Sequence, residues 1–117
     1  MTLREFAKTA AKERLYNLYV VELTPDVLKK KKFMKENAGH NPKMPPLYVG
    51  MSARKPGERF RQHKKGYKAN LLAQRYGKRL VPKLFQDHGP MPFEQAKQME
   101  EQLAKRLRRQ GYAVWQR

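Results

Sequence analysis

Two short stretches of the chain have the composition of buried β-strands. Residues 16–23 (YNLYVVEL) and 47–52 (LYVGMS) are rich in β-branched and aromatic residues. Residues 79–85 (RLVPKLF) predict a third strand, at an edge of the sheet because Pro82 cannot donate to a ladder. Residues 112–115 (YAVW) predict a short strand or an extended tail. The pattern therefore predicts a small sheet built from distant parts of the chain.

Helical periodicity and helix-ending residues alternate with these strands. We expect helices over 56–65, which stops at Gly66, and over 92–109, with a further helical piece at 68–77. A capping box at Thr2 and Glu5 predicts a helix over 2–13, within an N-terminal segment 1–15. Residues 24–46 are expected to be a loop insertion with one helical turn near 26–37.

This order of elements predicts one mixed α/β domain over residues 1–117, with a small sheet. The chain has no cysteine, which excludes a disulfide framework and a thiolate zinc site. The N-terminus lacks the apolar core of a secretory signal, and no apolar run approaches the roughly 18 residues of a membrane helix. We therefore expect a cytoplasmic or nucleoid-associated protein that does not bind membranes.

Charge is the strongest global signal, because 27 Lys and Arg residues face only 10 Asp and Glu, a formal net charge of +17. Such an excess repels itself unless a polyanion is nearby. Nucleic acid is the expected partner, and DNA is favoured over RNA. The lysines at 29–32 are either a solvated run or extra phosphate contacts.

The helix over 92–109 separates two adjacent carboxylates. At about 100° per residue, its apolar residues form one stripe roughly 80° wide. Glu100 lies about 55° from the centre of that stripe, whereas Glu101 lies about 155° away. Glu100 is therefore expected at the edge of the buried face, where it either pairs with an arginine or binds a divalent cation. The scarcity of other acidic residues favours a single, water-rich Mg²⁺ over zinc.

Arg59 and His63 are i, i+4 neighbours that flank the core face expected for Phe60, Tyr67 and Leu71. Both side chains can therefore point into one cleft. Tyr19 and Tyr48 each lie in the middle of an apolar strand. Their rings either only pack in the core or, if the two strands pair, present both hydroxyls to the same cleft.

The series NLY, YVG, ERFRQH, AKQMEEQL and YAVW, from about residue 16 to 115, resembles the GIY-YIG nuclease superfamily. The resemblance implies a small mixed or antiparallel three-stranded sheet flanked by helices. It carries over the two motif tyrosines, the helix arginine and histidine, and the metal-binding glutamate onto Tyr19, Tyr48, Arg59, His63 and Glu100. The chain departs from the family in its long connection between the tyrosines, in Asn17 at a motif glycine, and in Ala113 where many members have asparagine.

The resemblance implies an endonuclease that hydrolyses DNA phosphodiester bonds with Mg²⁺ or Mn²⁺ held by Glu100. Arg59 would stabilise phosphoryl charge, and one of the two tyrosines would position or deprotonate water with help from His63. The alternatives are a non-cleaving DNA- or RNA-binding protein on the same scaffold, and an unrelated ribosome-associated or RNA-packaging protein. The residues expected to contact phosphate are Lys29, Lys30, Lys31, Lys32, Arg54, Lys55, Arg61, Lys64, Lys65 and Lys68.

Overall fold

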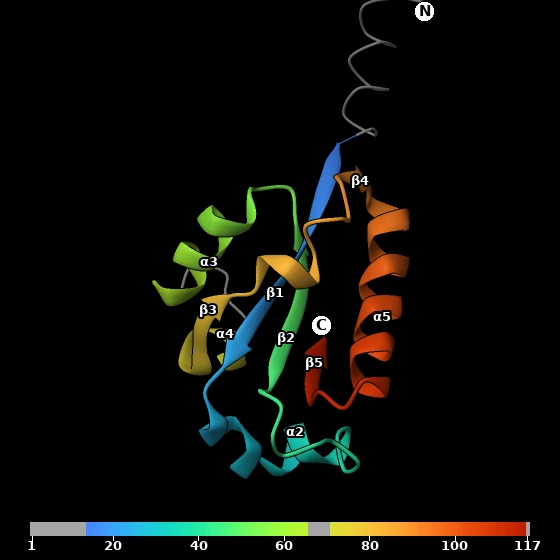
Figure 1. Cartoon of the computed structure of the whole chain (residues 1–117). Coiled ribbons are helices and arrows are strands. Elements are labelled where there is room, and N and C mark those ends of the chain that lie inside the picture. The colour runs from blue at the N-terminus through green and yellow to red at the C-terminus, as the bar shows by residue number, and fades with distance from the viewer. Residues whose placement is uncertain (1–13, 66–70, 117) are drawn as a thin grey trace, which may run out of the picture.

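The protein is an α/β domain in which a mixed sheet is flanked by helices (Figure 1). The computed structural model describes residues 14–65 and 71–116, without the side chains of His63, Lys64 and Leu71. The helix expected over 2–13, the end of a helix at Gly66, and Lys68 lie outside this part of the chain. In the described residues, no helix is long and apolar enough to cross a membrane.

An antiparallel hairpin of β1 (Leu15–Leu23) and β2 (Leu47–Ser52) forms the centre of the sheet. Tyr19 pairs with Gly50 and Val21 pairs with Tyr48, so these side chains share one face of the sheet. Val20 pairs with Val49 and lies on the opposite face. Both strands are buried on both faces, which explains why they are nearly continuous apolar runs rather than alternating ones.

The sheet has five strands rather than the three expected, in the order β3-β1-β2-β5, with β4 also paired to β1. β3 (Gly77–Leu80) is antiparallel to β1, and β5 (Val114–Gln116) is parallel to β2. β4 is the two-residue strand Met91–Pro92, which is antiparallel to the start of β1. The sheet is therefore mixed, and β5 completes it next to β2.

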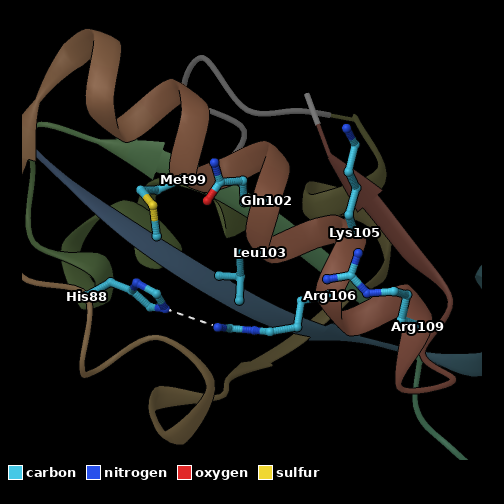
Figure 2. A pocket seen from close by; sticks show the side chains of 7 residues that line it. All are labelled: His88, Met99, Gln102, Leu103, Lys105, Arg106 and Arg109. Carbon is cyan, nitrogen blue, oxygen red and sulfur yellow. Dashed lines mark hydrogen bonds between the residues drawn. The ribbon is translucent and has the colours of Figure 1, made fainter.

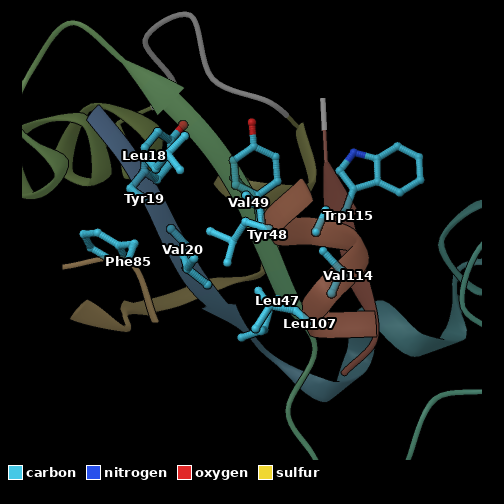
Figure 3. Packing of buried hydrophobic residues seen from close by; sticks show 14 of the residues in the cluster. Leu18, Tyr19, Val20, Leu47, Tyr48, Val49, Phe85, Leu107, Val114 and Trp115 are labelled. Atoms are coloured by element: carbon cyan, nitrogen blue, oxygen red, sulfur yellow. The ribbon is translucent and has the colours of Figure 1, made fainter. Parts of the chain in front are cut away.

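Helices cover both faces of the sheet (Figure 1). α3 (Pro56–Lys64) and α4 (Leu71–Tyr76) lie on the face of Tyr19 and Tyr48. α5 (Phe93–Arg109) lies on the face of Val20 and Val49. As the periodicity predicts, the buried side of α5 includes Ala96, Leu103 and Leu107. Figure 3 shows the resulting core around β1, β2 and β5.

The strand expected over 79–85 is only partly correct. β3 ends at Leu80, and Pro82–Leu84 forms the short 3-10 helix η2. Proline is favoured at the first position of such a turn because its φ is fixed and its missing N–H is not needed there. Pro82 thus ends the strand instead of continuing it at an edge.

The segment 24–46 is a folded part of the domain rather than a loose loop. It contains the 3-10 helix η1 (Pro25–Lys29) and the helix α2 (Lys31–Lys35), which bury Val27 and Phe33 completely. Asn37 attaches it to β5: its amide oxygen accepts the N–H of Val114 at 2.8 Å, and its amide nitrogen donates to the carbonyl of Val114 at 3.0 Å. The lysine-rich segment is thereby fixed against the edge of the sheet.

Candidate functional site

Tyr19 and Tyr48 form a buried pair on the face of the sheet covered by α3 and α4. Their ring centroids are 6.0 Å apart, and the residues are 2% and 4% exposed. Gly50 makes this arrangement possible, because a Cβ at that position would lie 2.6 Å from the Tyr19 hydroxyl oxygen and 2.9 Å from Cε1 of Tyr48. The expectation that pairing of the two strands brings both tyrosines to one face is confirmed.

Arg59 on α3 joins this pair. Its guanidinium lowers the pKa of Tyr19 by its charge and by hydrogen bonding, and its charge also lowers the pKa of Tyr48. Within its own helix, Nη1 of Arg59 donates to Oε1 of Gln62 at 3.2 Å. Arg59 is half-buried, whereas Arg61 is exposed, as expected if only the first faces the site.

Burial outweighs the effect of Arg59 on both tyrosines. Loss of hydration is the largest influence on each phenol, and it raises the pKa of Tyr19 and of Tyr48 above the ordinary value. Hydrogen bonding within the pair raises the pKa of Tyr19 and lowers that of Tyr48. The positive charge of the chain therefore does not bring these pKa values below the ordinary value, and both phenols are neutral near pH 7.

Glu100 is buried on α5, 6% exposed, whereas its neighbour Glu101 is exposed. This confirms the orientation predicted from the helical angles. Burial raises the pKa of the Glu100 carboxyl, and a hydrogen bond from the side-chain amide of Gln116 opposes that rise. The partner of Glu100 is thus an amide, and no ion pair to Glu100 occurs in the described part of the chain.

Tyr48 is subject to the charges of two groups, Arg59 on α3 and Glu100 on α5. Its pKa is lowered by the charge of Arg59 and raised by the charge of Glu100. Glu100 belongs to the helix on the other face of the sheet, so the carboxylate and the guanidinium act on Tyr48 from different layers of the domain. A phosphate near Tyr48 would therefore be within electrostatic range of both groups.

Gln116 was missed in the sequence. It pairs with Val49 in the parallel ladder, so its side chain lies on the α5 face and reaches Glu100. An isolated glutamine carries no motif, and only the parallel pairing of β5 with β2 places it there. Asn17, at a motif glycine position, has a structural contact as well: its amide donates to the carbonyl of Arg54 at 3.3 Å and holds the turn between β2 and α3.

The residues expected to contact phosphate lie at both ends of β2. One group is on η1 and α2, before β2, and the other is on the turn and helix α3 that follow it. All of those that the structure describes are exposed: Lys29, Lys30, Lys31, Lys32, Arg54, Lys55, Arg61 and Lys65. Arg54 is engaged by Glu58 at 3.1 Å, and Lys29 by Asp26 at 3.5 Å. The side chains of His63 and Lys64 and all of Lys68 are outside the described part of the chain.

The donor set suits a divalent cation held mainly by water. In the described residues there is no cluster of three or more His, Asp or Glu side chains, so Glu100 is the carboxylate available near Tyr48. The amide nitrogen of Gln116 donates to Oε1 of Glu100, so Oε2 is the carboxylate oxygen that this hydrogen bond leaves for a cation. Mg²⁺ commonly binds one or two protein oxygens and keeps several waters, so these residues fit it.

A basic hollow lies beside α5, and its described lining does not include Tyr19 or Tyr48 (Figure 2). Its volume is about 270 Å³, and Arg106 at its rim contacts Nε2 of His88 at 3.2 Å. Its described lining contains no carboxylate and consists of His88, Met99, Gln102, Leu103, Lys105, Arg106 and Arg109. It therefore offers positive charge without the elements of a hydrolytic site.

Comparisons with protein-family models, curated proteins and solved structures find no match to this chain.

Proposed function

We propose that the protein is a divalent-metal-dependent endonuclease that hydrolyses phosphodiester bonds in DNA, on a GIY-YIG-like scaffold. The observation that carries the proposal is the position of Tyr48. The centroid of its buried ring lies 6.0 Å from that of Tyr19, and the charges of the cationic Arg59 and of the buried Glu100 both act on its phenol. A cation that binds a phosphoryl oxygen and a carboxylate that can hold Mg²⁺ or Mn²⁺ are the two charged groups that phosphodiester hydrolysis needs.

In this proposal, Arg59 binds the scissile phosphate and stabilises the negative charge that grows on its oxygens. Removing one such donor typically costs about 3–4 kcal/mol of transition-state stabilisation. Glu100, with Gln116, would hold the divalent cation, which supplies Lewis-acid polarisation of the phosphate when bound. Both groups act on the phosphate, which leaves the water to be oriented by other residues.

The neutral phenols suit a positioning role. Each hydroxyl is one donor and also an acceptor, so Tyr19 and Tyr48 can orient the attacking water and a phosphoryl oxygen without being ionised. Because the charges of both Arg59 and Glu100 act on Tyr48, whereas of these two only Arg59 acts on Tyr19, Tyr48 is the one we assign to the water. His63, one turn after Arg59 on α3, is proposed to assist in moving the water's proton.

One observation favours a non-cleaving nucleic-acid-binding protein as the second candidate. The raised pKa values of Tyr48 and Glu100 disfavour the phenolate and the carboxylate, which are the forms that a base and a metal ligand need. An unrelated packaging protein is less well supported, because it gives no reason to bury Glu100 beside Gln116.

Plasmid nicking at low salt tests the proposal, with Mg²⁺ or Mn²⁺ and with EDTA as the control. The wild type is compared with Arg59→Gln and Glu100→Gln, and each has an adjacent exposed control, Arg61→Gln and Glu101→Gln. We expect metal-dependent nicking that falls at least 100-fold in the first two variants while DNA binding persists. Glu101→Gln keeps the activity, and Arg61→Gln raises KM without lowering kcat.

If the wild type and all four variants bind DNA and none of them cleaves it, the proposed endonuclease function is wrong and the non-cleaving binding function takes its place. The same assay on branched and single-stranded DNA shows whether such a result reflects the wrong substrate.

A further inference from the structure

A cavity of about 470 Å³ opens between α4, α2 and β5. It is larger than the hollow beside α5, and it falls in the range of about 300–1,000 Å³ that small-molecule pockets occupy. It combines apolar and cationic walls. Among the described residues its lining has no acidic side chain and consists of Lys30, Lys32, Phe33, Leu72, Arg75, Tyr76 and Trp115.

The cavity adjoins the tyrosine pair. Trp115 on β5 is the register partner of Tyr48 on β2, so the two side chains lie on the same face of the sheet, on strands about 4.8 Å apart. Figure 3 shows Tyr48 and Trp115 side by side on these neighbouring strands. Whatever occupies the cavity is therefore one strand away from the proposed reaction centre.

The aromatic wall is held rigidly. Trp115 stacks on Phe33 with centroids 6.3 Å apart and an interplanar angle of 22°, and Nζ of Lys32 lies 5.5 Å from the Trp115 ring centroid. The opposite wall is tied down by a 2.8 Å hydrogen bond from the N–H of Thr24 to the carbonyl of Tyr76. A preformed wall loses little conformational entropy when a planar ligand binds against it.

The cationic side of the cavity is available to a ligand. Lys30, Lys32 and Arg75 are exposed, and none of them belongs to an ion pair among the described residues. In contrast, Lys78 and Arg79 on β3 are both engaged by Glu22, at 3.5 and 3.2 Å. Positive charge next to aromatic rings suits a ligand that is planar and apolar at one end and anionic at the other.

We propose that this cavity binds the base and the flanking phosphate of one unpaired DNA nucleotide, next to the phosphodiester held at Tyr48 and Arg59. The base would lie against the half-buried ring of Tyr76, in front of Trp115 and Phe33, which are 3% and 0% exposed, and the phosphate would lie against Lys30, Lys32 and Arg75. The proposal deepens the proposed function and rests on it for the position of the scissile bond. Base–aromatic contact accepts any base, because every base has a π-face.

The proposal defines the substrate class. A base inside a duplex cannot enter the cavity without leaving its stack, and leaving costs less when the base is already unpaired. The preferred substrate is thus DNA with unpaired nucleotides beside the cleaved bond, such as a flap, a bulge or a single strand. Lysines and arginines alone, in contrast, would bind duplex phosphates equally well.

Trp115 is the only tryptophan of the chain, so its fluorescence reports on this cavity directly. We would titrate the full chain, in EDTA and at fixed low salt, with a deoxythymidine oligonucleotide and with an abasic oligonucleotide of equal length and charge. The variants are Tyr76→Leu, which keeps an apolar side chain, and the double variant Lys30→Gln/Lys32→Gln. Lys105→Gln, an exposed lysine on α5, is the control for loss of charge. Circular dichroism verifies that each variant is folded.

The proposal predicts saturable quenching by the thymidine oligonucleotide, with about tenfold weaker binding of the abasic one. The lysine double variant and Tyr76→Leu each weaken binding of the thymidine oligonucleotide about tenfold, whereas Lys105→Gln changes it less than twofold. The proposal is overturned by equal binding of the abasic strand, by an absence of quenching, or by equal effects of Lys105→Gln and the double variant. If an oligouridine binds more tightly than the thymidine oligonucleotide, the nucleotide in the cavity comes from RNA and the assignment to DNA is wrong.

The two proposals fail separately. If quenching follows the predicted variant pattern but no metal-dependent nicking occurs, nucleotide binding in the cavity is supported and the endonuclease activity is refuted. Nicking that is identical for paired and bulged DNA, in wild type and in Tyr76→Leu, leaves the nuclease and removes the cavity.

Discussion

Tyr19 occupies the space in which a side chain of Gly50 would lie. The two residues are register partners across β1 and β2, and a Cβ on Gly50 would come within 2.6 Å of both Cζ and the hydroxyl oxygen of Tyr19. The absence of a side chain at position 50 thus determines where the phenol of the candidate site lies.

Gly50→Ala is expected to lower the free energy of unfolding by about 1–3 kcal/mol, since overpacking of a buried site forces neighbouring rings to move. It also lowers the nicking rate, because the displaced ring is Tyr19. Urea denaturation and nicking assays measure the two effects. Gly39→Ala is the control, because a Cβ there meets nothing within 4 Å. Equal stability of the two variants would contradict the packing described here.

The hydrogen bond within the tyrosine pair predicts opposite responses to removal of either hydroxyl. Tyr19→Phe raises the pKa of Tyr48, since hydrogen bonding with Tyr19 lowers it. Tyr48→Phe lowers the pKa of Tyr19, because the charge of Tyr48 and hydrogen bonding with it both raise that pKa. NMR titration of protein labelled at the tyrosine Cζ measures each phenol, and Arg59→Gln is expected to raise both pKa values. Shifts of the same sign in the two phenylalanine variants would refute the coupling.

Glu100→Gln is expected to stabilise the fold at neutral pH while it abolishes nicking. Because burial raises the folded pKa of Glu100 above the unfolded value of about 4.3, the folded state holds the proton more tightly. Its contribution to stability is therefore full below the unfolded pKa and is lost as pH rises through the folded pKa. The glutamine retains the carbonyl oxygen that accepts from Gln116 and has no charge to bury.

Urea denaturation as a function of pH tests this, with Glu101→Gln as the control for the same change in net charge. The stability gain of Glu100→Gln over the control grows as pH rises through that window and is then constant. A gain that shrinks with rising pH would mean that the folded protein favours the carboxylate.

Asn37→Ala is expected to cost about 1–3 kcal/mol of unfolding free energy, because it leaves buried backbone groups of β5 without their amide partner. The Asn37 side chain forms hydrogen bonds to the N–H and C=O of Val114, the carbonyl of Phe33 and Nε of Arg108. Asn41→Ala, which removes one exposed hydrogen bond to the N–H of Lys43, is the control, with an expected loss below about 0.5 kcal/mol. Hydrogen exchange at Val114 then shows whether β5 opens first.

The elements that were predicted correctly are those with a local signal in the sequence. β1 and β2 are short apolar runs, α5 has an apolar stripe at helical spacing, and the inward orientation of Glu100 follows from helix geometry alone. The pairing of β5 with β2 and the position of Gln116 had no local signal, because parallel pairing joins segments that are distant in the chain. The extent of folded structure in residues 24–46 was not predicted, because the large apolar residues that are fully buried there, Val27 and Phe33, are too few to form a periodic stripe.

The tyrosine pKa values could not be read from composition either. A net charge of +17 acting by itself would depress them, but desolvation acts within contact distance and most of the charge is at the solvated surface. Local burial therefore outweighs the overall charge.

The alternation of side chains along β1 limits how this chain can change length in evolution. Inserting or deleting one residue within Leu15–Leu23 would exchange the two faces of the strand, turning Leu18 and Val20 toward α3 and α4 and the phenol of Tyr19 toward α5. Insertions or deletions of two residues would keep each side chain on its face of the strand but would change its pairing partners on β2 and β3. Natural variation in length is therefore expected to accumulate outside the strands and away from Phe33 and Asn37, for example at the turn around Gly39, where a Cβ meets nothing within 4 Å.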